Sequence, residues 1–185
     1  MDPTAFIQNA ARSDLMRSLR YGQPWILMEQ TPSAVNWRGR NALKRPNQMR
    51  LWSYQCVSRA ANGIMFFQWR AAKAGAEKFH GAMVPHAGAD TRIYREVAQL
   101  GNELKTLSEL VDTRTRSDVA MVFDWDNWWV LEQESHPSQE INPLNQVGAY
   151  HRSLHQRNLA VDFVPSTVDL DTLKQYKLVV VPNLY

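Results

Sequence analysis

The sequence lacks the residues and runs that mark several specialised protein classes. Cys56 is its single cysteine, which excludes an internal disulfide and a metal cluster built on cysteines. No apolar run approaches the roughly 18 residues that span a bilayer. The N-terminus, MDPTAFIQNAARSD, lacks the charged and apolar regions of a signal peptide. We therefore expect a cytoplasmic protein with no membrane partner.

Sequence motifs for several kinds of catalysis are absent too. The chain contains no glycine-rich phosphate loop, no CxxC pair and no HExxH pattern. These absences argue against nucleotide hydrolysis, thiol redox chemistry and zinc proteolysis. We expect no cofactor and assign no metal ligand in this chain.

Charge is distributed unevenly along the chain. Basic and acidic residues number 15 and 9 up to Asp112, but 6 and 9 after it. A basic stretch at residues 38–50, flanked by Trp37 and Trp52, raises the question of nucleic-acid binding. Arginines are sparse elsewhere and no nucleic-acid motif occurs. We interpret the stretch as a solvated loop and helix start, and expect no nucleic-acid partner.

Three helices are predicted in residues 1–112. Asp2-Pro3 and Asp90 are typical of helix starts. Cys56 lies on the apolar stripe of the second helix, so we interpret it as a core residue and not as a nucleophile. The apolar stripes run through Ile7, Ala11, Leu15 and Leu19, through Met49, Trp52, Cys56 and Ala60, and through Ile93, Val97, Leu100, Leu104 and Leu107.

Two short apolar runs, at residues 25–28 and 64–67, predict fully buried strands. A long loop follows each strand, at residues 30–47 and 71–89, and long ordered loops are usually functional. Because a helix separates the strands, we expect them to be parallel.

The second block begins at residue 113. Its pattern predicts the order strand, helix, strand, helix, strand, which is the opening of a doubly wound sheet. The last strand has no following helix, and a bare parallel sheet face is not stable in water. We therefore expect the sequence to be a fragment of a longer chain. The predicted elements cover residues 119–123, 143–156, 161–164, 171–175 and 178–181.

The run PWILMEQTPSAVNW places a carboxylate, Glu29, at the end of a predicted strand. A parallel barrel presents its catalytic groups at this end of its strands. The loop after the next strand carries Glu77 and His80, and carboxylates with such neighbours suit glycoside hydrolysis. Taken singly, Glu29 also fits a buried or capping acid, and His80 fits a structural histidine.

Three stretches together carry a specific resemblance: LMEQTPSAVNW, FFQWR and GAEKFHGAMVPHAG. They resemble the C-terminal part of the catalytic barrel of family 42 β-galactosidases. The sequence from about Thr113 resembles the start of that family's trimerisation domain. The resemblance implies an α/β fold in which residues 1–112 form the C-terminal portion of a (β/α)8 TIM barrel. Residues 113–185 would then form a truncated Rossmann- or flavodoxin-like trimerisation domain.

The resemblance also implies a function and residue roles. The whole protein would be a retaining β-galactosidase and a homotrimer, hydrolysing terminal β-D-galactosyl residues through a covalent glycosyl-enzyme intermediate. Glu29 matches the family's nucleophile at the end of the seventh barrel strand. Trp37 matches a tryptophan lining the galactose pocket, and Glu77 and His80 match residues that bind sugar hydroxyls. Lesser candidates, for which packing is at least as good an interpretation, are Phe67, Trp69, Arg70 and His86.

A retaining glycosidase needs a second carboxylate, an acid/base about 5 to 5.5 Å from the nucleophile. The resemblance places it in an Asn-Glu pair upstream of this chain, whereas Asn102-Glu103 lies within a predicted helix. The zinc-binding cysteines of some family members would also lie upstream. We therefore expect the isolated chain to be inactive. The alternative is a non-catalytic remnant that acts as a carbohydrate-binding or oligomerisation module. The acids of the second block are interpreted as solvated or subunit-facing, namely Asp124, Asp126, Glu132 and Glu134.

Overall fold

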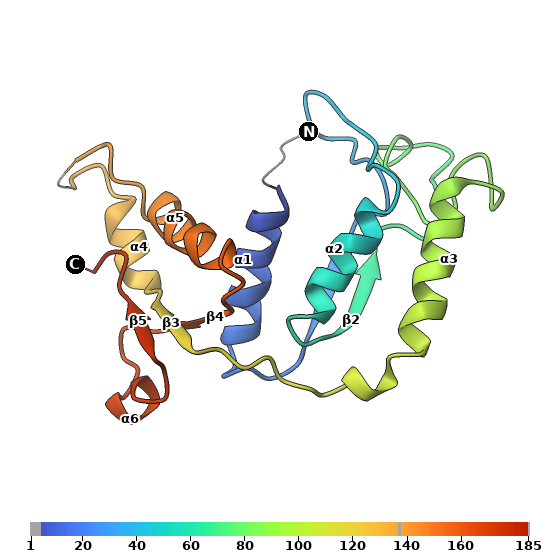
Figure 1. Ribbon diagram of the computed structural model, residues 1–185. Helices are drawn as coiled ribbons and strands as arrows, with labels where there is room; N and C mark the ends of the chain where they lie inside the picture. Colours follow the sequence, from blue (N-terminus) through green and yellow to red (C-terminus); the bar gives the residue numbers. More distant parts are fainter. Residues whose placement is uncertain (1–4, 137, 185) are drawn as a thin grey trace. The chain divides into compact units, whose positions relative to one another are not determined.

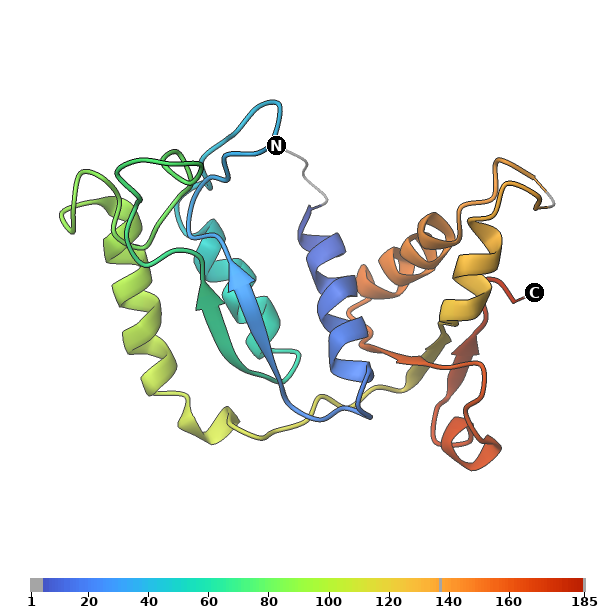
Figure 2. The ribbon, with the colours of Figure 1, turned by 180° about the vertical axis from the view of Figure 1, so that it is seen from behind.

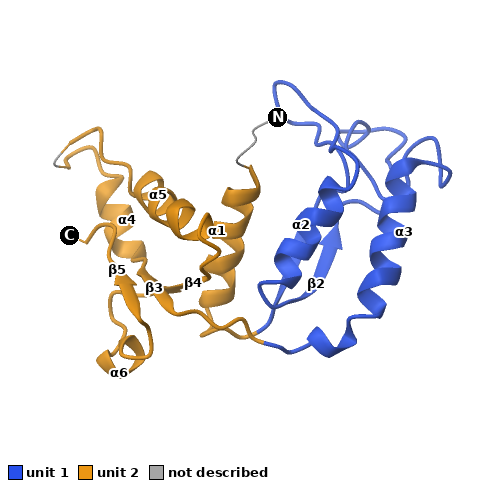
Figure 3. Ribbon diagram, viewed as in Figure 1, with its two compact units in different colours: residues 1–3, 24–113 blue, residues 4–23, 114–185 orange. Residues whose placement is uncertain are grey.

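The computed structural model describes residues 5–136 and 138–184 (Figure 1). These residues form two compact units (Figure 3). Unit 1 contains Pro24–Thr113, and unit 2 contains residues 5–23 together with the residues from Arg114 onward. Among the described residues, no helix combines the length and the apolar character needed to cross a membrane.

Unit 1 is built on two strands, β1 (Trp25–Gln30) and β2 (Ala61–Phe66), which pair in parallel. The predicted parallel arrangement is therefore confirmed. β2 begins earlier than predicted because the turn after the preceding helix closes at Ala60, whose φ of 63° is left-handed. The other elements of the unit are α2 (Gln48–Val57), α3 (Arg92–Lys105) and the 3-10 turn η1 (Ser108–Leu110).

The burial predicted for the two strands is wrong in the described residues. Ile26 and Met28 are 53% and 69% exposed, and Met65 on β2 is 51% exposed. Among the described residues each strand pairs only with the other, and the Gln30 side chain of β1 bonds to Ser53 of α2 on the covered side. The opposite apolar face therefore has no cover within these residues. Cys56 is buried, as predicted for a core residue.

α3 starts one residue later than the sequence suggests. Thr91, not Asp90, is the N-cap, since its hydroxyl oxygen accepts a hydrogen bond from the Tyr94 N–H at 3.3 Å. Asn102-Glu103 lies in this helix, as predicted.

Unit 2 contains a parallel sheet with the strand order β4-β3-β5. Helices and turns cover both faces: Met121, Phe123, Val161 and Phe163 form the core on one face, and Ala120, Val122 and Val164 on the other. The predicted strand and helix order is confirmed. The elements are α1 (Ala5–Ser18), β3 (Val119–Val122), α4 (Trp125–Leu131), α5 (Pro143–His155), β4 (Val161–Val164), α6 (Leu170–Leu173) and β5 (Leu178–Val180).

The aromatic stretch after β3, for which the pattern predicts no element, forms α4. Asp124 caps this helix by accepting a hydrogen bond from the Asn127 N–H at 2.8 Å. That hydrogen bond is the main reason why the pKa of Asp124 lies below its usual range. Glu132 accepts a hydrogen bond from the Trp128 indole at 2.7 Å.

α1 lies in unit 2, where it packs on β4 and α5. Its buried face carries Asp14 and Arg17, whereas Leu19, predicted to be on the apolar stripe, is exposed. The predicted stripe is therefore wrong at this end, because ion pairs let charged residues occupy the buried face. The expected domains, 1–112 and 113–185, stay a prediction, and the compact units differ from them in α1. The predicted cap at Asp2-Pro3 lies outside the described residues.

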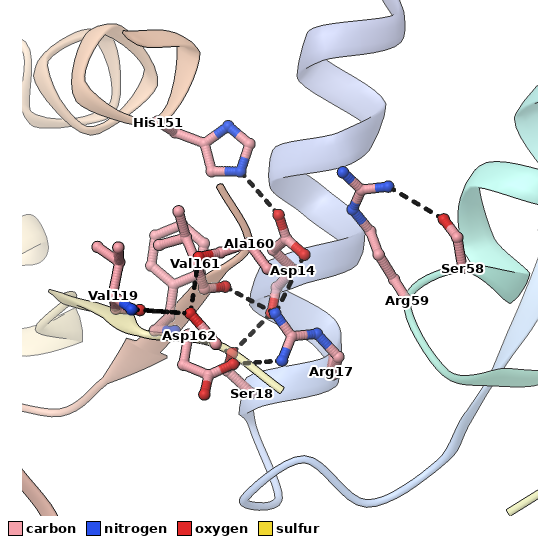
Figure 4. Close-up of polar contacts among 12 residues, drawn as sticks. Asp14, Arg17, Ser18, Ser58, Arg59, Val119, His151, Ala160, Val161 and Asp162 are labelled. Atoms are coloured by element: carbon pink, nitrogen blue, oxygen red, sulfur yellow. Dashed lines mark hydrogen bonds and ion pairs between the residues drawn. The ribbon is translucent and has the colours of Figure 1, made fainter. Parts of the chain in front are cut away.

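A buried ionic network fixes α1 to the sheet (Figure 4). The Arg17 guanidinium pairs with Asp14 at 3.2 Å and with Asp162, and donates to the Val161 carbonyl at 2.8 Å. His151 Nε2 of α5 lies 2.9 Å from the other oxygen of Asp14. Arg17, Asp14 and His151 are each 1% exposed. The Arg17 guanidinium is compensated by two carboxylates and a backbone carbonyl, whereas Arg17 Nε and His151 Nδ1 are buried without a hydrogen-bond partner among the described residues.

Candidate active site

The two parallel strands of unit 1 end at the same edge. Gln30 of β1 is in register with Phe66 of β2, and the Phe67 N–H donates to the Gln30 carbonyl at 3.1 Å. Figure 2 shows both arrows pointing the same way, with the loops after them leaving from the same end. Every predicted site residue lies at this edge or in these loops, which is where a parallel sheet of the barrel kind carries its chemistry.

Glu29 is the last residue but one of β1, and its side chain is exposed. Within residues 5–136 and 138–184 its carboxylate forms no hydrogen bond or ion pair. The next residue points the other way: Gln30 is buried and its amide donates to the Ser53 hydroxyl at 3.0 Å. The pairing register of β1 shifts between Leu27 and Gln30, so regular alternation is interrupted at Glu29. Gln30 is anchored to α2, and the carboxylate before it stays exposed.

Trp37 lies in the loop after β1 and is 69% exposed. The Arg38 guanidinium lies 5.3 Å from the centroid of its ring. Asn36, next to it, donates through its amide to the Ala76 carbonyl at 2.6 Å and to Glu77 Oε2 at 3.2 Å. The loop that carries Trp37 is therefore hydrogen-bonded to the loop that carries Glu77.

A glycine contact joins the same two loops. The Gly81 N–H donates to the Ala34 carbonyl at 2.7 Å. A Cβ at Gly81 would lie 2.7 Å from that oxygen and 2.9 Å from the Ala34 nitrogen. Only glycine fits so close an approach of two backbones.

His80 is buried, unlike Glu77, which is exposed. Its ring packs edge-on against Phe67 with the centroids 4.9 Å apart, and its Nδ1 lies 2.8 Å from the Gly81 carbonyl. That contact favours the tautomer protonated at Nδ1, in which Nε2 is an acceptor for a hydroxyl.

The lesser candidates are either exposed to solvent or hydrogen-bonded within the loop. Trp69 and Arg70 are exposed at the start of the second loop. The ring of His86 is tied to the loop, since its Nε2 lies 2.8 Å from the Lys78 carbonyl. In the described part of the chain, no three His, Cys, Asp or Glu side chains are grouped so as to hold a metal ion.

Lys44 is a feature that the sequence did not reveal. It belongs to the stretch interpreted as solvated, yet it is 8% exposed. Its ammonium donates to the Thr31 carbonyl and lies 4.8 Å from the centroid of the Trp52 ring. Burial lowers the pKa of Lys44 to about 8. Asn36 was also missed, and its position beside Trp37 was the only signal for it.

Comparison with known families decides what kind of chain this is. The β-galactosidase model of glycoside hydrolase family 42 matches residues 2–107. The chain belongs to this family. The β-galactosidase trimerisation domain model matches residues 117–185 of the same family 42 chain.

Curated and solved relatives agree with the family. A β-galactosidase of Geobacillus sp. is 57% identical over 180 residues, which cover 97% of this chain and 26% of that protein. One from Heyndrickxia coagulans is 51% identical over 93% of this chain and 25% of its own length. The crystal structure of a β-galactosidase from Bacillus circulans sp. alkalophilus has a TM-score of 0.91 and 43% identity, covering 98% of this chain and 27% of that one.

The family 42 chain thus spans about a quarter of the length of these relatives. The matches confirm the predicted fold class, the C-terminal part of a TIM barrel followed by part of a trimerisation domain. They also account for the uncovered apolar face of β1 and β2, because in a full barrel the strand faces are covered by the packed interior and by the outer helices.

Proposed function

We propose that this chain is part of a retaining β-galactosidase and supplies its nucleophile, Glu29, together with one side of the galactose pocket. The observation that carries the proposal is the exposed carboxylate of Glu29 at the C-terminal end of a parallel strand, which has no partner among the described residues. An ionised carboxylate in that place attacks the anomeric carbon and forms the glycosyl-enzyme intermediate.

The loops supply the groups that hold the sugar. Glu77 accepts hydrogen bonds from two adjacent hydroxyls through its two oxygens, and His80 accepts one at Nε2. Trp37 offers an exposed indole face for the apolar side of the sugar ring. The Asn36 amide orients Glu77 by binding one of its oxygens.

The acid/base carboxylate belongs, in this proposal, to the part of the enzyme outside these 185 residues, since the relatives are about four times as long. That carboxylate protonates the leaving oxygen and then activates the water that releases galactose. The 185-residue chain by itself is expected to show no β-galactosidase activity.

A trapping experiment on the full-length protein tests the nucleophile. A 2-deoxy-2-fluoro-galactoside with a good leaving group should label the enzyme covalently. Trypsin cuts after Arg20 and Arg38, and Glu29 is the only acid in the peptide between them. The label is expected on peptide 21–38. Label on the peptide that contains Glu77, which ends at Lys78, would contradict the assignment.

We also propose that the full-length protein is a cytoplasmic homotrimer. Support for the trimer comes from the trimerisation domain match and from the exposed apolar side chains Trp129 and Val130 on α4. Support for the location comes from the composition, with one cysteine in the chain. Sedimentation of the full-length protein is expected to give three times the monomer mass, and a monomer at micromolar concentration would contradict the proposal.

A further inference from the structure

The ammonium group of Lys44 is a buried cation, and no carboxylate of residues 5–136 or 138–184 forms an ion pair with it. It donates to the Thr31 carbonyl and lies over the Trp52 ring, and burial lowers its pKa to about 8. Arg92 of the neighbouring helix α3 donates to the Lys44 carbonyl and not to its ammonium, and it pairs with Glu96 of the same helix at 2.8 Å. Burying a charge in this way costs free energy. A methionine of similar length would fill the same space without that cost.

The acceptor of Lys44 lies on the main chain close to the proposed nucleophile. Thr31 is two residues after Glu29 and follows Gln30. Gln30 is already fixed, because its side chain donates to Ser53 and its carbonyl accepts the Phe67 N–H. The bond from Lys44 fixes the next peptide unit, at the point where the chain leaves the strand. The main chain just after Glu29 is thus held by groups from α2, from the residue that follows β2 and from the loop that carries Lys44.

The other end of Lys44 is fixed to α3. Its carbonyl accepts a hydrogen bond from Arg92 Nη2 at 3.1 Å. Glu96, the partner of Arg92, also accepts from the Asn47 N–H at 3.2 Å. The loop between β1 and α2 is therefore joined to α3 at two main-chain positions, Lys44 and Asn47. Lys44 transmits this fixed position to the end of β1.

We propose that Lys44 is a positioning residue for the glycosylation step: its ammonium holds the Thr31 carbonyl and so fixes the direction from which Glu29 attacks the sugar. The inference rests on the proposed role of Glu29. In this proposal Lys44 itself contacts no substrate group. The Trp52 ring stabilises the buried ammonium through a cation–π contact, which offsets part of the hydration that the ammonium loses.

The test compares Lys44→Met with wild type in the full-length enzyme. The inactivation rate constant with the fluoro-galactoside, which reports attack by Glu29, is expected to fall about ten- to a hundredfold, because small misplacements of reacting groups have effects of this size. The inhibitor's dissociation constant should change less than about threefold, since the sugar-binding loops keep their contacts. Lys105→Met, an exposed lysine at the end of α3, is the matched control and should leave both constants unchanged.

Arg92→Met is the second variant, and it keeps the test valid if Lys44→Met does not fold. Arg92 is 37% exposed in its side chain, and the substitution frees the Lys44 carbonyl while leaving its ammonium in place. A fall of about threefold in the same rate constant, with binding unchanged, is expected. Rate constants within about twofold of wild type in the folded variants, or a loss confined to binding, would overturn the proposal.

The two proposals fail in different ways. If the label lies outside peptide 21–38, the role of Glu29 is wrong and Lys44 has nothing to position. If Glu29 is labelled but Lys44→Met reacts as fast as wild type, only the role of Lys44 is wrong.

Discussion

The two units use charged side chains in opposite ways. In unit 1 the charge of Glu29 is exposed and unpaired among the described residues, while the buried groups Gln30 and Lys44 hold the backbone behind it. In unit 2 the charges of Asp14 and Arg17 are themselves buried and paired. A charge that is kept free of partners can react with a ligand, whereas a buried, paired charge fixes the packing of its neighbours. Substitutions should therefore affect activity in unit 1 and stability in unit 2.

Glu29→Gln in the full-length protein should have the largest effect of the substitutions, and this effect should be on activity. Removing a nucleophile is expected to lower kcat by about a thousandfold or more. Thermal stability should stay near that of wild type, because an exposed side chain without partners contributes within about 0.5 kcal/mol. Glu109→Gln, an exposed acid in η1, is the control for activity. Retention of more than about a tenth of wild-type kcat would rule out Glu29 as nucleophile.

Arg17→Met tests whether the buried charges of unit 2 determine stability. It leaves Asp14 and Asp162 without their cation, and breaking a buried ion pair typically costs about 3 to 5 kcal/mol. Hydrogen exchange of the β4 amides in the full-length protein, where the Val161 carbonyl accepts from Arg17, should report this loss as faster exchange.

Arg157→Met provides the comparison for Arg17, since Arg157 is an exposed arginine of the same unit that donates to the Ser153 carbonyl. Its effect should stay within about 0.5 kcal/mol. Equal exchange in the two variants would show that the buried network does not hold α1 on the sheet.

Gly81→Ala tests a part of unit 1 where the backbone packing changes and no charge is added or removed. The new Cβ would meet the Ala34 carbonyl, and overpacking of this kind costs about 1 to 3 kcal/mol. We expect the two loops to separate and kcat/KM to fall about tenfold as the sugar contacts loosen. Gly39→Ala, with open space around it, is the control. Unchanged kcat/KM in Gly81→Ala would mean that the loop contact does not shape the pocket.

The smallest effect is expected at Glu103, a paired charge of unit 1 that lies on the surface. Arg50 and Gln99 donate to it, and these hydrogen bonds lower the pKa of Glu103 to about 2. Because the pKa of Glu103 is lower in the folded protein, its ionised form stabilises the fold at pH values above the unfolded pKa of 4.5. This contribution is lost as the pH falls from 4.5 towards 2. Glu103→Gln should therefore have a flatter dependence of Tm on pH in that range. Parallel curves for the two proteins would contradict this account.

Sequence patterns predicted the parallel strands and the order of elements, because those depend on local periodicity and on short connections. The patterns did not predict which side chains are buried where that burial depends on a partner distant in the sequence. Asp14 and Arg17 have no apolar signal, and their burial depends on partners far along the chain, among them Asp162 and His151. The burial of Lys44 could not be predicted for the same reason, since it depends on contacts with Trp52 and with the Thr31 carbonyl. The exposure of Ile26 and Met28 reflects a chain that spans about a quarter of its relatives.

Of the site, the sequence predicted Glu29, Trp37, Glu77 and His80 through a family resemblance, and the structure places all of them at one strand edge or in its loops. Their roles stay predictions. The supporting contacts of Asn36 and Gly81 could not be predicted, since hydrogen bonding between two loops follows from tertiary geometry and not from residue type.

The contacts of Asn36 and Gly81 with the neighbouring loop have a consequence for engineering substrate preference. Residues 31–36 and 75–81 share an amide bridge and a backbone contact that admits only glycine. Transplanting one loop from another enzyme would bring a surface shaped for a different partner. The two segments therefore form one exchangeable cassette, to be grafted together or left in place.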